Sequence, residues 1–532
     1  MSLESNTLES NSLEPIVLTT PLFYVNDRPH IGSAYPTIAA DALARFYRMK
    51  GHPVMFVTGT DEHGQKIQRT AEKNNLSPQE HCDRTVAEFY SLWEKFNIRF
   101  DRFTRTTAPK HQAIVNEFFQ RVYDAGDIYL NQQKGWYCVA CEEFKEEREL
   151  PESHHCPIHT NVVCEWRDEP NYFFRLSKYQ NALDQFHIAN PNFIQPESRR
   201  NEVLGFMKQG LQDFSISRVN LDWGFPIPTD PTHTIYVWFD ALLGYVTALL
   251  DPDDAPTLEN ALKKWYPFNL HIIGKDILRF HAIYWPAMLM SAGLALPKRV
   301  FGHGLLTKDG LKMGKTLGNT IDPYDLVDRF GADALRYYFL REIEFGRDGD
   351  FNEERFIAIA NADLANSLGN LLNRTLGMVG KYCQQAIPEY DASDRHEVSD
   401  LLRPLIEQAT ALGDRVATDY QNLNFRAACE KILELIWNCN KLIDETTPWK
   451  LFKAGKQKEV NETLYVLLES VRIAIYLLSP ITPSLAISVY QQLGLSFDET
   501  SPPDWSHTNW GMLQVGQPLS TPTPIFQRIE HS

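Results

Sequence analysis

Apolar positions in the first sixty residues follow the repeat of a strand, then of a helix, then of a strand. The run from Ile16 to Tyr24 is almost entirely apolar and ends in the polar turn 26–29, which predicts a buried strand leading into a loop. Positions 35–46 carry apolar side chains at helical spacing, and Gly51 follows where a helix C-cap is expected. A second strand is predicted over 52–58, so the segment has the order of a parallel crossover unit.

A similar unit recurs far downstream. Residues 269–274 and 299–306 are predicted strands, and the apolar positions of 276–292 predict a helix between them. Two such halves would form the parallel sheet of a Rossmann-type nucleotide-binding α/β fold, split by an insertion. After Phe356 the pattern changes to long helical repeats, which predict an all-helical C-terminal domain. These repeats cover 356–382, 398–420, 425–444 and 460–478.

The same patterns give approximate domain boundaries. Residues 1–14 nearly repeat a Ser/Asn/Leu/Glu pattern without an aromatic anchor, and we expect them to form a flexible tail. The remaining boundaries are 15–115 for the first half of the α/β domain, 116–233 for the insertion, 234–325 for the second half, 326–355 for a linker, 356–515 for the helical domain and 516–532 for a C-terminal tail.

Composition and charge narrow the class of protein. The 532 residues are 43% hydrophobic and 23% charged, as in an ordinary globular protein with several cores. No apolar run approaches the ~20 residues of a membrane helix, and the N-terminus lacks the order of a signal peptide, so we expect a cytoplasmic protein that contacts no membrane. The net charge of −16 argues against indiscriminate binding of nucleic acid, which draws on neutralised phosphates.

A cysteine cluster in the insertion predicts a metal site. Cys138-x-x-Cys141 and Cys156-x-x-His159 form two knuckles whose thiolates and imidazole can close a tetrahedron around Zn²⁺. Four protein ligands leave no open position, so one zinc ion is expected to order the insertion and to take no part in chemistry. Neighbouring residues that could replace one of these ligands are Cys164, His154 and His155.

Two loops have the composition of phosphate-binding sites. His30-Ile31-Gly32-Ser33 lies between a predicted strand and a predicted helix, where backbone N–H groups and the helix dipole attract phosphate. The segment 312–316, Lys-Met-Gly-Lys-Thr, follows the last strand of the second half, and its two ammonium groups suit a leaving pyrophosphate. Taken singly, each loop is more simply explained as a helix cap or a solvated basic turn.

Together the two loops resemble the signature sequences His-Ile-Gly-His and Lys-Met-Ser-Lys-Ser of the class I aminoacyl-tRNA synthetases. The sequence departs from these signatures at Ser33, which replaces the second His, and at Gly314 and Thr316, which replace the two serines. Because Ser33 can still donate a hydrogen bond and both lysines remain, we expect slower or differently tuned activation and not its loss.

Further stretches, from about Pro15 to Glu530, resemble the methionine-specific members of this family, of the type with a single zinc knuckle. The resemblance implies that Asp61 holds the ammonium group of the substrate, for which a carboxylate is the natural partner. It also implies that aromatic rings surround the thioether, where each sulfur–ring contact contributes ~0.3–1.5 kcal/mol. Core packing is the alternative role for Trp238 and Tyr245. The residues implied to bind methionine are Leu22, Tyr24, Asp61, Trp238, Ala241, Tyr245, Phe280 and His281.

The same resemblance implies an ATP site that also binds Mg²⁺ with the nucleotide. Asp276 is expected to touch the ribose and Lys275 a phosphate, while Arg218 is expected to face the reaction centre, with a surface ion pair as its alternative role. The residues implied to bind ATP are His30, Gly32, Ser33, Lys275, Asp276, Lys312 and Lys315. Those implied in catalysis are His30, Asp61, Arg218, Lys312 and Lys315.

A polar face in the helical domain is the candidate RNA-binding surface. Asn366, Asn370 and Arg374 recur every four residues and therefore share one side of a helix. Trp449 offers an aromatic platform on which a base can stack, worth ~1–3 kcal/mol. The resemblance implies that these residues read the anticodon, since RNA sequence is read mostly on unpaired bases. Without it, they would be a solvated helix face and a packing residue.

The resemblance therefore implies an ATP-dependent ligase that converts L-methionine to methionyl-adenylate and transfers it to initiator and elongator tRNA(Met). It also implies that the insertion guides the acceptor end and that the linker 326–355 contacts the tRNA stem. The chain stops soon after the helical domain, which leaves no room for a dimerising barrel, so we expect a monomer.

Three alternatives remain. A synthetase for isoleucine, leucine or valine would need a large editing domain, for which the insertion has little room. An adenylating enzyme that does not use tRNA would not need the helical domain with its Asn, Arg and Trp residues. A non-catalytic RNA-binding derivative is favoured by Ser33 and Gly314 and disfavoured by the retained His30 and Asp61.

Overall fold

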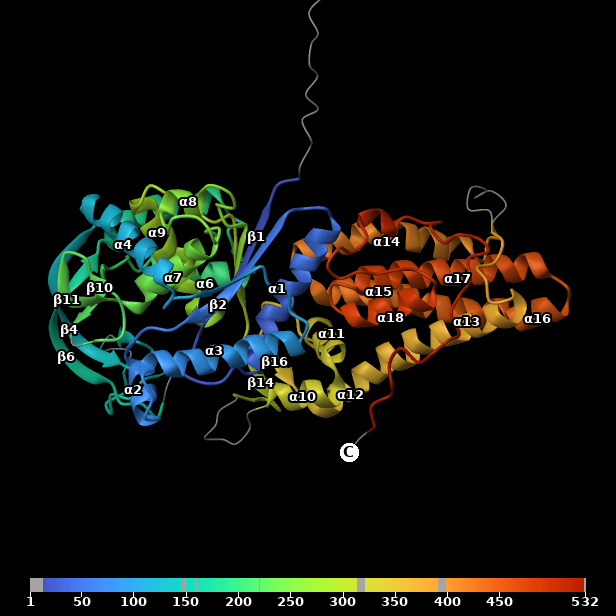
Figure 1. Cartoon of the computed structure of the whole chain (residues 1–532), viewed down its shortest axis with the longest axis horizontal. Helices are drawn as coiled ribbons and strands as arrows, with labels where there is room; N and C mark the ends of the chain where they lie inside the picture. Colours follow the sequence, from blue (N-terminus) through green and yellow to red (C-terminus); the bar gives the residue numbers. More distant parts are fainter. Residues whose placement is uncertain are drawn as a thin grey trace, which may run out of the picture. The chain divides into compact units, whose positions relative to one another are not determined.

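The structure is a computed structural model of the chain, shown in Figure 1. It describes residues 13–145, 147, 150–157, 160–219, 221–312, 321–390 and 399–530, with the side chain of Lys312 excepted. The chain divides into two compact units. We call Val17–Ala40 with Met55–Leu305 the sheet unit, and Asp41–Val54 with Leu306–Ser532 the helical unit.

The sheet unit is centred on a six-stranded sheet with the strand order β3-β2-β1-β12-β13-β7. The pairs whose register is known in the described residues are all parallel, which confirms the predicted Rossmann-type sheet. The order reverses between β1 and β12, and ligands of such sheets bind beyond the carboxyl ends of the strands at this point. The strands are β1 Ile16–Tyr24, β2 Val54–Asp61, β3 Arg102–Arg105, β7 Ile194–Gln195, β12 Leu270–Gly274 and β13 Val300–His303.

Helices cover this sheet, and the first follows its predicted course. It ends next to Gly51, whose φ of +84° suits a glycine C-cap. The helix predicted over 276–292 is less regular, because a 3-10 turn at Lys275–Ile277 and a π-turn at Phe280–Tyr284 precede α9. Helix α1, Ile31–Met49, belongs to the sheet unit as far as Ala40. The other helices of the sheet unit are α2 Gln65–Lys73, α3 Pro78–Lys95, α4 Pro109–Asp124, α5 Gln180–Ala189, α6 Glu197–Met207, α7 Val237–Ala248, α8 Leu258–Leu262 and α9 Trp285–Ser291.

The insertion forms two small sheets of its own and also extends the main sheet. One sheet has the order β5-β4-β6-β8 and the other the order β10-β11-β9. Its strand β7 pairs in parallel with β13, a contribution that the sequence did not predict. The strands are β4 Ile128–Cys138, β5 Glu143–Lys145, β6 Glu165–Phe174, β8 Phe214–Ser215, β9 Ser217–Val219, β10 Pro226–Ile227 and β11 Asp230–Ile235.

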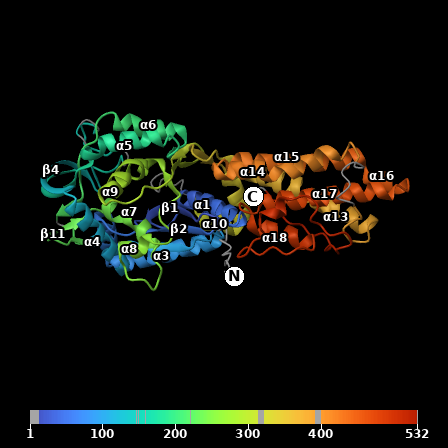
Figure 2. The same ribbon diagram turned by 90° about the horizontal axis from the view of Figure 1, so that it is seen from above.

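The helical unit confirms the predicted all-helical C-terminal domain. Helix α17 is buried along almost its whole length, and α13, α14, α15 and α16 pack against it (Figure 2). A small sheet, β15-β14-β16, precedes these helices. The elements are β14 Leu306–Lys308, β15 Leu311–Lys312, α10 Pro323–Phe330, α11 Ala332–Glu342, β16 Gly349–Phe351, α12 Glu353–Ala360, the π-helix η6 Asn361–Gly369, α13 Asn370–Tyr382, α14 Arg403–Gln421, α15 Phe425–Thr446, α16 Pro448–Lys453, α17 Gln457–Leu478 and α18 Pro483–Gln492.

A buried ion-pair cluster ties the C-terminal part of α1 into the helical unit. The guanidinium of Arg336 is fully buried, and it donates to Asp41 at 2.6 Å and to the carbonyl oxygens of Pro480 and Ile481. Asp41 also accepts from Arg45 at 2.8 Å. Removing one partner of such a cluster leaves a buried charge uncompensated, so the cluster fixes these segments in one arrangement. None of the described helices has the length and apolar composition needed to cross a bilayer.

Candidate functional site

Asp61 is the central carboxylate of the candidate site. It ends strand β2 beside the switch point, it is 7% exposed, and the backbone N–H of His63 donates to it. Its Oδ1 is buried and has no hydrogen-bond partner among the described residues. Burial, helped by the charges of Asp240 and Glu142, raises the pKa of Asp61 well above its usual value. A buried carboxylate with an open oxygen is suited to a cationic ligand such as an ammonium group.

Asp240 is a second buried carboxylate, and it is held between two histidines. Its Oδ2 lies 2.6 Å from Nδ1 of His63, and its Oδ1 lies 2.8 Å from Nε2 of His111. Burial alone would raise the pKa of Asp240, but the two imidazoles lower it to about 2. The other ring nitrogen of His111 lies 2.7 Å from the hydroxyl of Thr247. This triad, which fixes the segment that follows Asp61, was not predicted from the sequence.

Glu142 is a third carboxylate, and it connects the cysteine cluster to strand β1. It follows Cys141 directly, it is 4% exposed, and its φ of +55° is uncommon for a residue other than glycine. It accepts hydrogen bonds from the backbone N–H of Lys66 at 2.7 Å and from the hydroxyls of Tyr24, at 3.2 Å, and Tyr137. Burial and the charge of Glu142 raise the pKa of Tyr24 well above its usual value, so Tyr24 remains a hydrogen-bond donor.

Aromatic rings form one wall of the candidate pocket. The rings of Trp238 and Phe280 stack with centroids 3.9 Å apart and planes 7° apart. His281 Nδ1 lies 3.1 Å from the carbonyl oxygen of Ile277, so this nitrogen carries the proton and Nε2 accepts from the hydroxyl of Tyr245 at 2.9 Å. Burial lowers the pKa of His281 to about 4, which keeps this ring neutral. The wall is therefore uncharged and suited to an apolar side chain.

Strand β1 reaches the same wall. Gly244 lies so close to Leu22 that a Cβ at this position would come within 2.4 Å of the leucine side chain. The backbone N–H of Leu22 donates to the hydroxyl of Tyr245, and Ala241, one helical turn earlier, is 6% exposed. The structure therefore brings Leu22 to Ala241 and Tyr245, although more than 200 residues separate it from them in the sequence. Their role in binding methionine stays a prediction.

The loop that contains His30 has the expected position between β1 and α1. His30 is exposed, and its Nδ1 accepts from the backbone N–H of Gly32 at 3.1 Å. A Cβ at Gly32 would come within 2.9 Å of the His30 ring, so a larger residue there would require this exposed ring to move. Ser33 is buried in the first turn of α1, and its carbonyl accepts from Thr37. The nucleotide contacts of these residues stay predictions.

The loop 274–276, which contains the predicted nucleotide-binding residues Lys275 and Asp276, follows strand β12. Lys275 is half-buried and Asp276 is exposed, both in the 3-10 turn at the carboxyl end of the sheet. A Cβ at Gly274 would come within 2.4 Å of the Asp276 carboxylate, so the carboxylate folds over the backbone. In the helical unit, Lys312 ends strand β15, whereas Lys315 lies outside the described residues.

Arg218 is buried in the insertion. It is 3% exposed and donates to Ser215 Oγ at 2.8 Å and to the carbonyl oxygen of Ser217 at 2.7 Å. Its guanidinium lies 4.1 Å from the centre of the Tyr236 ring, and it also donates to the hydroxyl of Tyr137. Because Tyr137 in turn donates to Glu142, hydrogen bonds connect Arg218 to this carboxylate through Tyr137. Its predicted catalytic role stays a prediction.

The predicted thiols of the metal site converge. The sulfur atoms of Cys138, Cys141 and Cys156 lie within 4.8 Å of one another, and those of Cys141 and Cys156 are 3.5 Å apart. Thiolates around a tetrahedral zinc, with Zn–S bonds of about 2.3 Å, lie roughly 3.8 Å apart, so this cluster fits the ion. Cys164 is buried in the same cluster, and its thiol hydrogen-bonds to Cys138. The predicted fourth ligand, His159, lies outside the described residues.

The two alternative histidine ligands have other contacts. His154 stacks on Trp136 with ring centroids 3.8 Å apart, and its Nε2 lies 3.3 Å from Glu147 Oε1. His155 forms an isolated β-bridge with Val163. Among the described residues, neither belongs to the group of converging ligand atoms.

The predicted anticodon residues lie in the helical unit. Asn366 is in the π-helix η6, while Asn370 and Arg374 follow in α13, and all three side chains are exposed. Arg374 donates to Asp444 of α15 at 2.9 Å. Trp449 is half-buried in α16. π-turns inside helices often mark functional positions, which agrees with the placement of Asn366.

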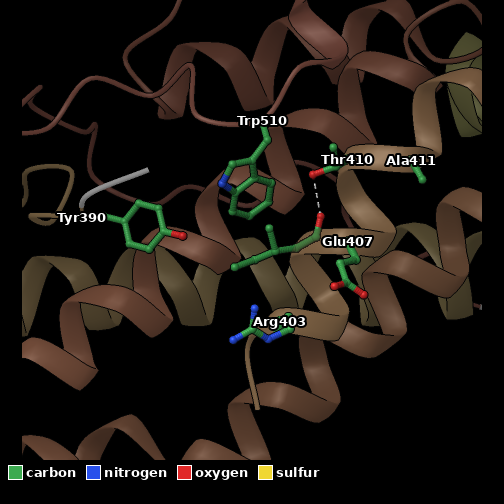
Figure 3. Close-up of a pocket in the computed structure, with 7 residues that line it drawn as sticks. Tyr390, Arg403, Glu407, Thr410, Ala411 and Trp510 are labelled. Carbon is green, nitrogen blue, oxygen red and sulfur yellow. Dashed lines mark hydrogen bonds between the residues drawn. The ribbon is translucent and has the colours of Figure 1, made fainter. Parts of the chain in front are cut away.

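A cavity of about 250 Å³ in the helical unit is lined by none of the residues above (Figure 3). One face of α14 forms its floor, and its walls include Tyr390 and the indole of Trp510. The lining residues are Tyr390, Arg403, Ile406, Glu407, Thr410, Ala411 and Trp510. None of them was predicted as a site residue.

Comparison with known proteins agrees with this geometry. A family model described as tRNA synthetases class I (M) matches residues 16–163 and 151–376, and one described as the anticodon-binding domain of tRNA ligase matches residues 403–511. The methionine–tRNA ligase of Synechocystis is 62% identical over 528 residues, which cover 98% of each chain. The chloroplastic/mitochondrial methionine–tRNA ligase of Arabidopsis thaliana is 52% identical over 97% of this chain and 83% of its own.

A solved structure extends the likeness to three dimensions. The methionyl-tRNA synthetase of Mycobacterium tuberculosis, in complex with methionyl-adenylate, superposes with a TM-score of 0.91 at 40% identity. The match covers 97% of this chain and 100% of that one. With the parallel sheet, the cysteine cluster and the helical unit, these matches show that the chain belongs to the methionine–tRNA ligase family of class I aminoacyl-tRNA synthetases.

Proposed function

We propose that the chain activates L-methionine with ATP and transfers it to the 3′ end of initiator and elongator tRNA(Met). The observation that carries this proposal is the buried Asp61 carboxylate, which has an open oxygen at the carboxyl end of β2, the strand next to the β1 that flanks the switch point, in a member of this family. An α-ammonium group is the cation that such an oxygen would bind in an amino-acid substrate.

In the first step, the methionine carboxylate attacks the α-phosphate of ATP, and pyrophosphate leaves. Asp61 would hold the ammonium group, while the uncharged wall of Trp238, Phe280 and Tyr245 would enclose the thioether. Positioning of this kind, with no covalent enzyme intermediate, supplies much of the rate in phosphoryl-type transfer. In the second step, the terminal ribose hydroxyl of the tRNA attacks the carbonyl carbon of methionyl-adenylate, and AMP leaves.

The groups that contact ATP are proposed from the loops. His30, Ser33 and the loop 274–276 would contact the nucleotide, and Lys312 and Lys315 would offset the charge of the leaving pyrophosphate. Mg²⁺ bound with ATP supplies further positive charge to the phosphates. Arg218 would act through Tyr137 and Glu142, by holding the carboxylate network in place.

The cysteine cluster is proposed to hold one structural Zn²⁺. Cys138, Cys141 and Cys156 would be three ligands and His159 the fourth, with Cys164 as the alternative fourth ligand. A zinc ion with four protein ligands contributes to folding and offers no position for substrate. The ion would therefore order the turn that contains Glu142.

Three further parts of the proposal concern the RNA and the state of the protein. Asn366, Asn370, Arg374 and Trp449 would read the anticodon. We propose a monomer, since Tyr24, Asp61, Asp240 and Glu142 meet within a single chain and need no second copy. We place it in the cytoplasm, where ATP and tRNA are available.

Aminoacylation tests this proposal. The purified chain is incubated with ATP, a tRNA(Met) transcript and labelled methionine, isoleucine, leucine or valine, and acid-stable label on the tRNA is counted. We expect charging with methionine alone, and a large loss of it in Asp61→Asn. Charging with another of these amino acids, or none with any of them, would overturn the proposal.

A further inference from the structure

Trp437 is an exposed aromatic side chain on an otherwise charged helix face. Seven residues of α15, all of which the structure describes, are exposed, and six of them are charged. These six are Arg426, Glu430, Glu434, Lys441, Asp444 and Glu445. Trp437 is the exception, with 47% of its surface exposed. A single exposed aromatic side chain is ordinary at a protein surface, so a role of Trp437 in binding depends on its neighbours and on the ability of aromatic rings to stack with unpaired bases.

The indole of Trp437 is held in one orientation. Its N–H donates to the hydroxyl of Ser367 at 3.3 Å, and the carbonyl oxygen of the same serine accepts from the Asn440 side chain at 3.1 Å. Ser367 lies in the π-helix η6, where its hydroxyl also lies 2.8 Å from the carbonyl oxygen of Ala362, five residues earlier. An aromatic ring held at one edge loses little conformational entropy when a ligand stacks on its open face.

Trp437 also lies in line with the proposed anticodon residues. Besides the bond from Asn440 to Ser367, α15 contacts the continuous segment of η6 and α13 through Trp437 with Ser367 and through Asp444 with Arg374, and these two contacts are seven residues apart on both sides. The two segments therefore run side by side in the same direction for about 10 Å. We call the strip between these two contacts, where α15 runs beside residues 367–374, the seam. Asn370 lies within it.

Trp449 would occupy the other end of the seam. Helix α15 continues for nine residues from Trp437 to Thr446, which is about 14 Å of helix. Helix α16, which carries Trp449, then packs against α13. The two indoles are therefore too far apart along α15 to sandwich one base, and they would serve different nucleotides of a single-stranded loop.

We propose that Trp437 is a second base-stacking platform of the anticodon-binding surface, and that it takes an unpaired base of the tRNA loop other than the one on Trp449. This inference rests on the proposed function. It is supported by the match of residues 403–511 to an anticodon-binding domain, which includes α15. Arg374 and Lys441 pair with Asp444 and Glu445 in the free protein, and they are the cations that would turn to the phosphates flanking such a base.

The test is binding of the isolated anticodon stem–loop of a methionine tRNA to the full chain, followed by fluorescence anisotropy of the labelled RNA. We expect Trp437→Ala to raise Kd about 5- to 100-fold, the value of one stacked base. Trp437→Phe keeps a ring and should stay within about threefold of the wild type. Leu401→Ala removes a similarly exposed apolar side chain, 46% exposed, outside the seam and should leave Kd unchanged.

Loops with an abasic nucleotide make the test specific. At one unpaired position, loss of the base should weaken binding to the wild type and leave binding to Trp437→Ala unaffected, because the partner is already missing. The loop position at which loss of the base leaves binding to Trp449→Ala unaffected should be a different one. If Trp437→Ala lowers the melting temperature, Trp437→Gln, which suits an exposed helix position, takes its place in the same titrations.

The outcomes separate this inference from the proposed function. If Trp449→Ala and Asn370→Ala weaken binding but the Trp437 variants bind like the wild type, the second platform is refuted and the anticodon site stands. If none of these variants changes Kd, the anticodon assignment of the proposed function fails as well. If Trp437→Phe is as weak as Trp437→Ala, the indole contributes by a contact other than stacking, and the inference is overturned.

Discussion

The candidate methionine site and the candidate anticodon surface present their ligand groups in opposite ways. In the sheet unit, Asp61, Asp240 and Glu142 are buried and joined by hydrogen bonds to histidines, tyrosines and backbone. In the helical unit, Asn366 and Asn370 are exposed side chains on a helix surface. Burying charge costs free energy unless partners compensate, so only the first arrangement must be completed by the rest of the fold.

The difference follows from the ligands that we propose. An ammonium group is small and carries one charge, so selectivity for it requires a carboxylate that water does not shield. Unpaired bases are large, flat and amphipathic, and exposed amides and aromatic rings are sufficient to bind them. Loss of a buried carboxylate that compensates other buried groups, such as Asp240, should therefore affect folding and catalysis together, whereas substitutions on the helical face should affect RNA binding alone.

The largest effect is expected from Asp61→Asn. This change keeps the shape of the side chain but removes the charge that would meet the substrate ammonium, and loss of one partner of a buried charge pair costs ~2–5 kcal/mol. We expect KM for methionine in ATP–pyrophosphate exchange to rise about 30-fold or more. A rise of less than about threefold would show that another group holds the ammonium.

Asp240→Asn should lower stability as well as activity. The change leaves His63 and His111 without their buried carboxylate, at a cost of ~3–5 kcal/mol in the free energy of unfolding. Because the pKa of Asp240 is depressed to about 2, this stability is present above the unfolded pKa of about 3.9 and is lost as pH falls toward 2. The free energies of unfolding of the wild type and of Asp240→Asn, measured in urea at pH 7 and at low pH, test this expectation. An equal difference between the two proteins at all pH values would contradict a stabilising interaction of the Asp240 carboxylate with the two histidines.

Glu142→Gln should have a smaller effect, confined to methionine. Hydrogen bonds to a charged acceptor contribute ~1.5–3 kcal/mol, and part of this would be lost at Tyr24 and Lys66. We expect Kd for methionine in equilibrium dialysis to rise about tenfold, with bound zinc unchanged. Glu143→Gln is the matched control, because that neighbouring carboxylate pairs with Lys145 and is 40% exposed. Equal effects of the two variants would argue against the link through Glu142.

The smallest effect is a pH dependence of methionine binding. The raised pKa of Asp61 means that its carboxylate takes up a proton at a higher pH than an ordinary aspartate, and the protonated form cannot neutralise an ammonium group. Affinity for methionine should therefore fall as pH falls, and this fall should begin well above pH ~4. In Asp61→Asn the profile should be flat; an equally steep profile in that variant would assign the titration to another group.

Local patterns in the sequence predicted much of the fold. Strand β1, helix α1 and the long helices α14, α15 and α17 follow from apolar periodicity, and the converging thiols follow from the spacing of Cys138, Cys141 and Cys156. The predicted strand over 52–58 extends in the structure to Asp61. Strand β7 was missed because two residues carry no periodic signal.

The supporting network could not be predicted in this way. Asp240 lies 177 residues from His63 and 129 from His111, and no local pattern marks three polar residues that meet only after folding. The same is true of Glu142, which reaches Tyr24 across 118 residues. The resemblance to the family identified residues expected to touch the substrate, whereas the groups that hold them in place became visible only in the structure.

Activation of methionine at Asp61 is tested most directly by ATP–pyrophosphate exchange, with the purified chain, each standard amino acid in turn and no tRNA. We expect exchange driven by methionine and by no other amino acid, and we expect Asp61→Asn to be severely impaired. Exchange with none of them would mean that Ser33 and Gly314 have cost the chain its activation step, and RNA binding alone would then replace methionine activation as its function.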